Sequence, residues 1–165
     1  MGLDMYLSVR KYVSQIDFSK GYDEEAGWSR TDDFQKLVES TGLEKLVEKD
    51  SSTGANVEVS VMYWRKANAI HKWFVDNRAD GVDECQPIQC HLEHLEELVA
   101  DCKSVIDDND LAEQVLPTED GFFFGGTEYD EYYFSDIQYT HDRLSEVMKL
   151  MREQDCDWAV YQASW

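Results

Sequence analysis

The chain has 165 residues and carries 35 acidic against 15 basic side chains, a formal net charge of −20 at pH 7. Its hydrophobic content of 42% and aromatic content of 13% exclude a disordered acidic tail, so we expect a single domain over residues 1–165. No apolar run approaches the ~20 residues that a membrane-spanning helix needs. The first residues also lack the basic and apolar stretches of a secretory signal, so we expect a cytoplasmic protein without a membrane partner.

The charge is distributed unevenly along the chain. Residues 80–165 carry 22 acids and 4 bases, whereas residues 51–79 carry 2 acids and 4 bases. Such a surface repels nucleic acid and anionic membranes, because both are bound through Lys and Arg. It attracts cations or proteins with a basic surface. The alternative is that the acids serve only to keep the protein in solution.

The first elements follow from alternation and capping signals. Alternating apolar residues predict a strand over residues 5–13, and the glycines and acids of residues 15–31 predict a loop. Thr31 is a suitable N-cap for a helix over residues 32–40, and Gly42 is a suitable residue to end it.

The remaining elements are predicted in the same way. Residues 56–64 alternate as a strand, and residues 65–77 and 92–106 have the apolar spacing of helices. A last helix begins near Glu128 and extends past Met151, and residues 157–165 form a closing strand. This order predicts an α+β fold: one compact domain in which a small antiparallel sheet packs with three to four helices. The helix over residues 92–106 is expected to have an apolar face formed by Leu92, Leu95, Val99, Cys102 and Ile106.

The four cysteines are too few for a disulfide scaffold in a chain of this length, and we expect reduced thiols. One short stretch nevertheless gathers possible metal ligands: Cys85, Cys90, His91 and His94. Their C-x4-C spacing is looser than that of most zinc sites and no second ligand pair follows, so we expect no metal, with structural zinc as the alternative.

A first candidate site lies in the stretch WRKANAIH. One side of the predicted strand–helix junction carries Trp64, Asn68, His71 and Val75. Arg65 and Lys66 fall at the expected helix N-terminus, where the helix dipole disfavours cations, which indicates an acidic neighbour or an anionic ligand. In the alternative interpretation His71 is a hydrogen-bonded core histidine and Arg65 pairs with an acid elsewhere.

A second candidate site lies in the stretch GFFFGGTEYDEYYFSD, residues 121–136. Thr127 and Asp130 resemble a capping box at the start of the last helix. The acids of that first turn argue against phosphate binding at this glycine turn. What remains is a patch of carboxylates and phenols: Glu128, Tyr129, Asp130, Glu131, Tyr132, Tyr133 and Asp136. Such a patch is suited to protein recognition, or it forms a ligand pocket that faces Arg65 and His71. In the alternative interpretation it is the solvated start of a helix whose tyrosines pack inward.

Neither a nucleophile motif nor a cofactor motif is recognisable in the sequence. We therefore expect no cofactor and favour a protein that is not an enzyme. An acid/base site that uses Glu128 or Asp130 stays open, because its geometry is not visible in a sequence.

Three stretches in combination, MGLDMYL, YWRKANAIHKWFV and FFFGGTEYDEYYFSD, together with the closing YQASW, resemble an uncharacterised family of small acidic proteins of bacteriophages and prophages. The resemblance covers nearly the whole chain. It implies an accessory protein in the cytoplasm of an infected bacterium, and it transfers no catalytic residue.

These observations predict an acidic accessory protein that binds and modulates a host protein with a basic surface, for instance as a counter-defence inhibitor that mimics nucleic acid, without binding nucleic acid itself. The alternative is a protein that binds or hydrolyses a small nucleotide-like ligand stacked on Trp64, in a pocket between the two stretches. The residues predicted to bind the partner or ligand are Trp64, Arg65, Asn68, His71, Glu128, Tyr129, Asp130 and Tyr132.

Overall fold

The computed structural model of the chain describes residues 2–48, 54–156 and 158–165. The chain divides into two compact units, a larger one of residues 1–10 and 58–165 and a smaller one of residues 11–57. The prediction of one domain over residues 1–165 stays a prediction.

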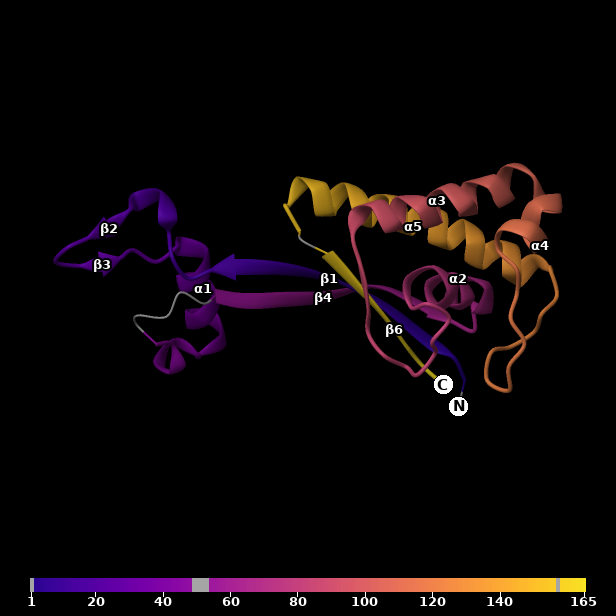
Figure 1. Cartoon of the computed structure of the whole chain (residues 1–165), viewed down its shortest axis with the longest axis horizontal. Coiled ribbons are helices and arrows are strands. Elements are labelled where there is room, and N and C mark those ends of the chain that lie inside the picture. Colours follow the sequence, from indigo (N-terminus) through magenta and orange to yellow (C-terminus); the bar gives the residue numbers. More distant parts are fainter. Residues whose placement is uncertain (1, 49–53, 157) are drawn as a thin grey trace. The chain divides into compact units, whose positions relative to one another are not determined.

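The main sheet has four strands in the order β4-β1-β6-β5 (Figure 1). Their bounds are Asp4–Ser14 for β1, Gly54–Arg65 for β4, Ile88–Cys90 for β5 and Trp158–Ser164 for β6. Strand β6 pairs antiparallel with both β1 and β5, so that Tyr161 lies opposite Leu7 on one side and Ile88 on the other. The three strands predicted from alternation are confirmed, except that residue 157 lies outside the described residues.

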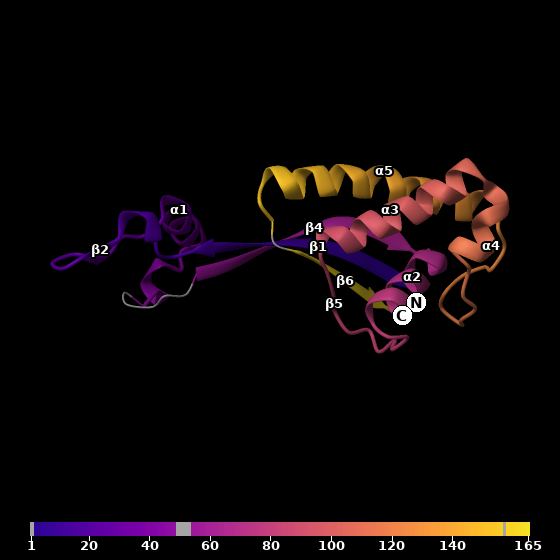
Figure 2. The same cartoon turned by 45° about the horizontal axis from the view of Figure 1, so that its top comes forward.

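Four helices belong to the larger unit: α2 (Asn68–Arg78), α3 (Leu92–Asp107), α4 (Ala112–Val115) and α5 (Glu131–Glu153). Both views show α3 and α5 side by side (Figures 1 and 2). With α1 in the smaller unit, the described residues hold five α-helices, because the short α4 adds one to the three or four expected. The α+β class with a small antiparallel sheet is confirmed. Within the described ranges, no helix is both long and apolar enough to cross a membrane.

The sheet has one buried and one exposed face, as its alternation requires. Trp64 of β4 and Tyr161 of β6 are buried, and Phe74 of α2 stacks on the Tyr161 ring with 3.9 Å between centroids. On the opposite face Tyr6 and Tyr63 are exposed and contact each other. The helices therefore cover the face of Trp64 and Tyr161, which places the core between the sheet and the helices.

Helix α3 is rotated relative to the expected orientation. Its buried residues are Leu95, Leu98, Cys102 and Val105, whereas Leu92, Val99 and Ile106 are only partly buried. The alternating spacing of three and four residues is the one that places side chains against a neighbouring helix, here α5. All four cysteines are free, with Cys90 and Cys102 buried and Cys85 and Cys156 partly buried.

The smaller unit contains two short helices, η1 (Phe18–Lys20) and η2 (Glu44–Leu46), the strands β2 (Tyr22–Asp23) and β3 (Gly27–Trp28), and α1 (Asp32–Thr41). The prediction of a loop over residues 15–31 was therefore incomplete. Asp23 stabilises the β2–β3 turn by accepting hydrogen bonds from the backbone of Glu25 and Ala26, a local pattern that the loop prediction did not resolve.

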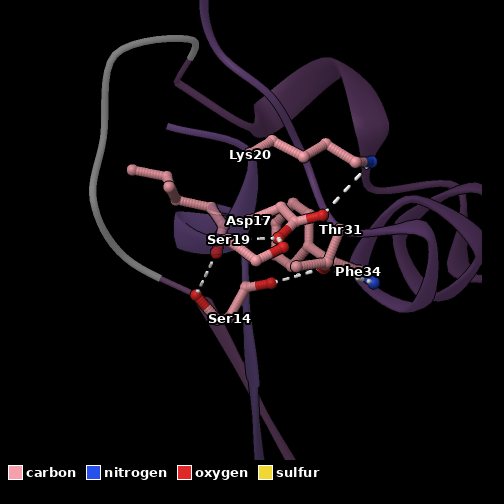
Figure 3. A network of polar contacts seen from close by, with 7 residues as sticks. Ser14, Asp17, Ser19, Lys20, Thr31 and Phe34 are labelled. Atoms are coloured by element: carbon pink, nitrogen blue, oxygen red, sulfur yellow. Dashed lines mark hydrogen bonds and ion pairs between the residues drawn. The ribbon is translucent and has the colours of Figure 1, made fainter. Parts of the chain in front are cut away.

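The predicted caps of α1 are confirmed. The Thr31 hydroxyl accepts from the Phe34 N–H and donates to the Ser14 carbonyl at 2.6 Å, which ties the helix start to the end of β1 (Figure 3). Gly42 ends the helix in the left-handed conformation, with φ of 71°. In the same network the Asp17 carboxylate accepts hydrogen bonds from Ser19 and pairs with Lys20.

Candidate functional site

A cavity of about 400 Å³ lies within the larger unit, between the β4–α2 junction and the segment that leads into α5. This volume falls in the range of roughly 300–1,000 Å³ typical of small-molecule sites. The residues that line it are Arg65, Lys66, Ala67, Asn68, Ala69, Ile70, Thr118, Gly125, Gly126, Glu128, Asp130, Tyr132, Tyr133, Asp136 and Ile137. The cavity thus joins the two stretches that the sequence singled out.

The β4–α2 junction turns at Lys66, which has a left-handed backbone with φ of 61°. The Lys66 N–H donates to the carbonyl of Leu3 at 2.8 Å, and α2 begins only at Asn68. The predicted helix start at residue 65 was therefore wrong, because strand pairing continues through Arg65. The two cations therefore precede the N-cap of α2 and are not part of its first turn.

The first turn of α2 lines the cavity without a side-chain cap. Ala67 occupies the N-cap position and has no side-chain acceptor for the first N–H groups of the helix. Such groups lack intrahelical partners and carry partial positive charge. This wall of the cavity is therefore electropositive in its backbone as well as in Arg65 and Lys66.

Asn68 holds the opposite wall in place. Its side-chain NH₂ donates to the carbonyls of Gly126 at 2.8 Å and Phe124 at 3.2 Å, and its side-chain oxygen accepts from the Glu119 N–H at 3.1 Å. Three hydrogen bonds from one buried side chain thus fix the segment between α4 and α5, drawn in orange in Figure 1, against α2.

The start of α5 differs from the prediction. The N-cap is Asp130, whose carboxylate accepts from the N–H groups of Tyr132 and Tyr133 at 3.0 and 3.1 Å. The predicted capping box with Thr127 as N-cap was wrong, because the chain at Thr127 is still part of the loop and its carbonyl accepts from the Thr118 hydroxyl. Asp130 lines the cavity, but its carboxylate is already used by the helix.

The cations of the cavity differ from the other cations of the larger unit. Seven of the nine Lys and Arg residues in this unit have a carboxylate within 4.0 Å: Arg10, Lys72, Arg78, Lys103, Arg143, Lys149 and Arg152. Across the described residues no such partner is found for Arg65 or Lys66, although Glu128 and Asp130 line the same cavity. The expected alternative, in which Arg65 pairs with an acid of the fold, is therefore not what the structure shows.

One carboxyl group of the cavity, that of Asp136, has a raised pKa. Asp136 is partly buried on α5, and desolvation, with a further contribution from Asp130, raises the pKa of its carboxyl to about 6. In the part of the chain that the structure describes, neither a hydrogen-bond donor nor a cation pairs with this carboxyl. Perturbed carboxyl groups in a cavity are typical of functional sites.

Five of the eight predicted site residues line the cavity: Arg65, Asn68, Glu128, Asp130 and Tyr132. The other three are Trp64, His71 and Tyr129. Tyr129 packs its ring on Tyr133, with 5.0 Å between centroids, and its hydroxyl lies 3.4 Å from the Thr118 N–H.

Trp64 and His71 belong to the core. The Trp64 indole N–H donates to the Thr140 hydroxyl at 2.8 Å, so the ring is not open to a stacking ligand. His71 is 1% exposed, and its two ring nitrogens lie 2.7 Å from the Tyr161 hydroxyl and 3.0 Å from the Asp83 carboxylate. The core interpretation of His71 is the correct one.

Sequence reasoning left ten of the fifteen lining residues out of the predicted set, among them the polar side chains of Lys66, Thr118 and Asp136. Asp136 and Tyr132 are four residues apart on α5, so helical spacing could have placed them on one side. Thr118 carried no sequence signal, because it reaches the cavity only through the fold of the preceding loop.

Three of the four possible metal ligands are used or buried within the fold. His91 and His94 form a reciprocal capping pair at the start of α3, and the thiol of Cys90 is buried. A search of the described residues finds no group of three or more His, Cys, Asp or Glu that could hold a metal ion.

The fold and cavity thus describe an α+β protein with a polar cavity that is lined by both cations and carboxylates. Comparison with protein families, curated proteins and solved structures finds no match. The resemblance to phage and prophage proteins stays a prediction.

Proposed function

We propose that this protein binds a small anionic ligand, with a phosphate or carboxylate group, in the cavity between β4, α2 and α5. The observation that supports the proposal most directly is that Arg65 and Lys66 have no carboxylate partner over the described stretches of the chain. Among the described residues of the larger unit they are the two Lys/Arg side chains without a carboxylate partner, and they are adjacent and line the same cavity.

The charge balance makes this arrangement informative. In the larger unit, seven of the nine Lys and Arg side chains have a carboxylate partner. Two neighbouring cations without one, beside the uncapped first turn of α2, provide charge and N–H donors for an anion. Glu128 and Asp130 lie on the opposite wall and repel an anion there, so the anionic group is expected at the Arg65/Lys66 end.

The test is binding of inorganic pyrophosphate, and of a panel of small phosphates and carboxylates, measured as a rise in the thermal unfolding temperature and by calorimetry. We compare the wild type with Arg65→Ala/Lys66→Ala. The matched control is Lys149→Ala/Arg152→Ala, which removes the same charge from exposed positions of α5. Binding by the wild type and the control but not by the cavity variant supports the proposal; equal binding by all three, or by none, overturns it.

A second candidate function is supported by exposed side chains at and before the start of α5, two of which, Glu128 and Tyr132, also line the cavity. Phe122 is 96% exposed and Tyr132 74% exposed, and Glu128 and Glu131 are exposed as well. Exposed aromatic rings among acids suit a host protein with a basic surface, which agrees with the resemblance to phage accessory proteins.

This second proposal predicts binding that weakens steeply with salt, because exposed charges are screened beyond ~8–10 Å. The variant of choice is Glu128→Lys/Glu131→Lys, since changing Asp130 would also remove the cap of α5. A partner captured from a bacterial lysate that stays bound to this variant and at high salt would contradict the charge-based interface.

A further inference from the structure

We infer that the ligand has two different ends, an anionic group held by Arg65 and Lys66 and a nitrogen heterocycle whose N–H groups donate to the carboxylate of Asp136. This is the chemistry of a nucleoside monophosphate whose base carries an exocyclic amino group. The inference rests on the proposed function, because it takes the anion at Arg65 and Lys66 as given.

Asp136 supplies the first argument. A partly buried carboxylate without a donor loses hydration and gains no hydrogen bond in return, which destabilises the folded protein. The described residues provide Asp136 with no such donor, and the carboxyl lines the cavity. A ligand N–H would supply it, and this explains why an acid is placed where an apolar or amide side chain would be more stable.

Tyr132 supplies the second argument. It precedes Asp136 by one helical turn on α5, both residues line the cavity, and the Tyr132 side chain is largely exposed. An aromatic face beside an acceptor binds a planar ring by stacking while the acceptor reads its N–H groups. An aliphatic amine would use Asp136 but not this ring, so the pair favours a nucleobase.

The position of the charges supplies the third argument. Arg65 and Lys66 come from the β4–α2 junction, and Asp136 comes from the second turn of α5, so opposite charges line one cavity without pairing with each other. A ligand with an anionic group at one end and N–H donors at the other pairs with the cations of one wall and donates hydrogen bonds to Asp136 on the other. A simple dianion pairs only with Arg65 and Lys66 and is repelled by the carboxylate of Asp136.

The test is isothermal titration calorimetry at pH 7.5 with CMP, AMP, GMP and UMP as probes, and pyrophosphate as the anion alone. UMP is the sharpest comparison with CMP, because it carries a carbonyl acceptor where CMP carries the amino donor. The variants are Asp136→Asn and Tyr132→Ala, and the control is Asp142→Asn, an exposed acid on the same helix.

We expect CMP to bind the wild type about 10-fold more tightly than UMP, and Asp136→Asn to abolish this preference while pyrophosphate binding is unchanged. Asp142→Asn should keep the preference, and Tyr132→Ala should weaken every nucleotide but not pyrophosphate. If pyrophosphate binds through Arg65 and Lys66 but no amino-bearing nucleotide is preferred, or if Asp136→Asn keeps the preference, this inference is overturned and the proposed function stands. If neither pyrophosphate nor any nucleotide binds, both are overturned.

Discussion

The side-chain amide of Asn68 donates a hydrogen bond of 2.8 Å to the carbonyl of Gly126, and so connects the first turn of α2 to a loop 58 residues further along the chain. The same side chain also bonds Phe124 and Glu119. Both walls of the cavity are therefore positioned by one buried amide.

Asn68→Ala should lower the free energy of unfolding by about 2–3 kcal/mol, because it leaves the N–H of Glu119 and two loop carbonyls without their partner. Urea unfolding followed by circular dichroism measures the effect. Asn77→Ala is the control, since Asn77 is exposed and its NH₂ makes one bond, to the Trp73 carbonyl. Equal losses in the two variants would show that Asn68 does not hold the loop.

Asp136→Asn should stabilise the protein at neutral pH. Burial raises the pKa of Asp136 from 3.8 to about 6, so between these values the folded chain keeps a proton that the unfolded chain releases. The wild type therefore loses stability as the pH rises through this window, and the variant does not. The free energy of unfolding of the variant should exceed that of the wild type by nearly zero at pH 4 and by about 1 kcal/mol at pH 8. The second figure allows for solvent screening at this partly exposed group.

Chemical unfolding of the wild type and of Asp136→Asn between pH 4 and pH 8 measures this difference in stability. The charged neighbours that line the cavity with Asp136 are Arg65, Lys66, Glu128 and Asp130, and they are unchanged in the variant. Asp142→Asn is the control: hydrogen bonds from His141 and Gln138 lower the pKa of Asp142, so its loss should give no gain at pH 8. A gain for Asp136→Asn that is the same at pH 4 and pH 8 would contradict the burial of the charge.

Tyr161→Phe should destabilise the protein by about 1–3 kcal/mol, because one ring nitrogen of the buried His71 loses its hydrogen-bond partner. The phenol lies 2.7 Å from that nitrogen, and its removal leaves the packing of the ring on Phe74 intact. Chemical denaturation compares this variant with Tyr139→Phe, in which the lost hydroxyl is on an exposed side chain. No difference between the two would mean that the His71–Tyr161 bond does not contribute to stability.

The four thiols should react in two classes. Burial raises the pKa of the Cys90 thiol to about 12 and raises that of Cys102 further, whereas Cys85 and Cys156 are partly exposed. Since the thiolate is the reactive form, a disulfide reagent should label Cys85 and Cys156 rapidly and the other two only on unfolding. Mass spectrometry of the labelled peptides assigns the classes, and rapid labelling of Cys102 in the folded protein would contradict its place in the core.

Local signals in the sequence were enough for α1 and for three strands of the main sheet. Thr31 and Gly42 mark the ends of α1 because a cap depends on a few neighbouring residues, and alternation identifies β1, β4 and β6 because one face of the sheet is buried. The same signals failed at residue 65 and at Thr127. There a hydrogen bond from the Lys66 N–H to the Leu3 carbonyl, and one from the Thr118 hydroxyl to the Thr127 carbonyl, decide where an element begins.

The sequence alone also indicated that the stretch around Arg65 and the stretch around Glu128 belong together, from their opposite charges. Which side chains line the cavity was decided only by the tertiary structure. Helical spacing placed His71 and Asn68 on one side, yet His71 lies in the core with Tyr161 while Asn68 faces the loop. Four of the paired cations of the larger unit have their carboxylate three or four residues away on the same helix, which helical spacing alone predicts. The carboxylate partners of Arg10, Arg78 and Arg152 are distant in sequence and are brought near only by folding. Seven cations of the larger unit found carboxylate partners, while Arg65 and Lys66, on a turn set by the bond from Lys66 to Leu3, did not in the described structure.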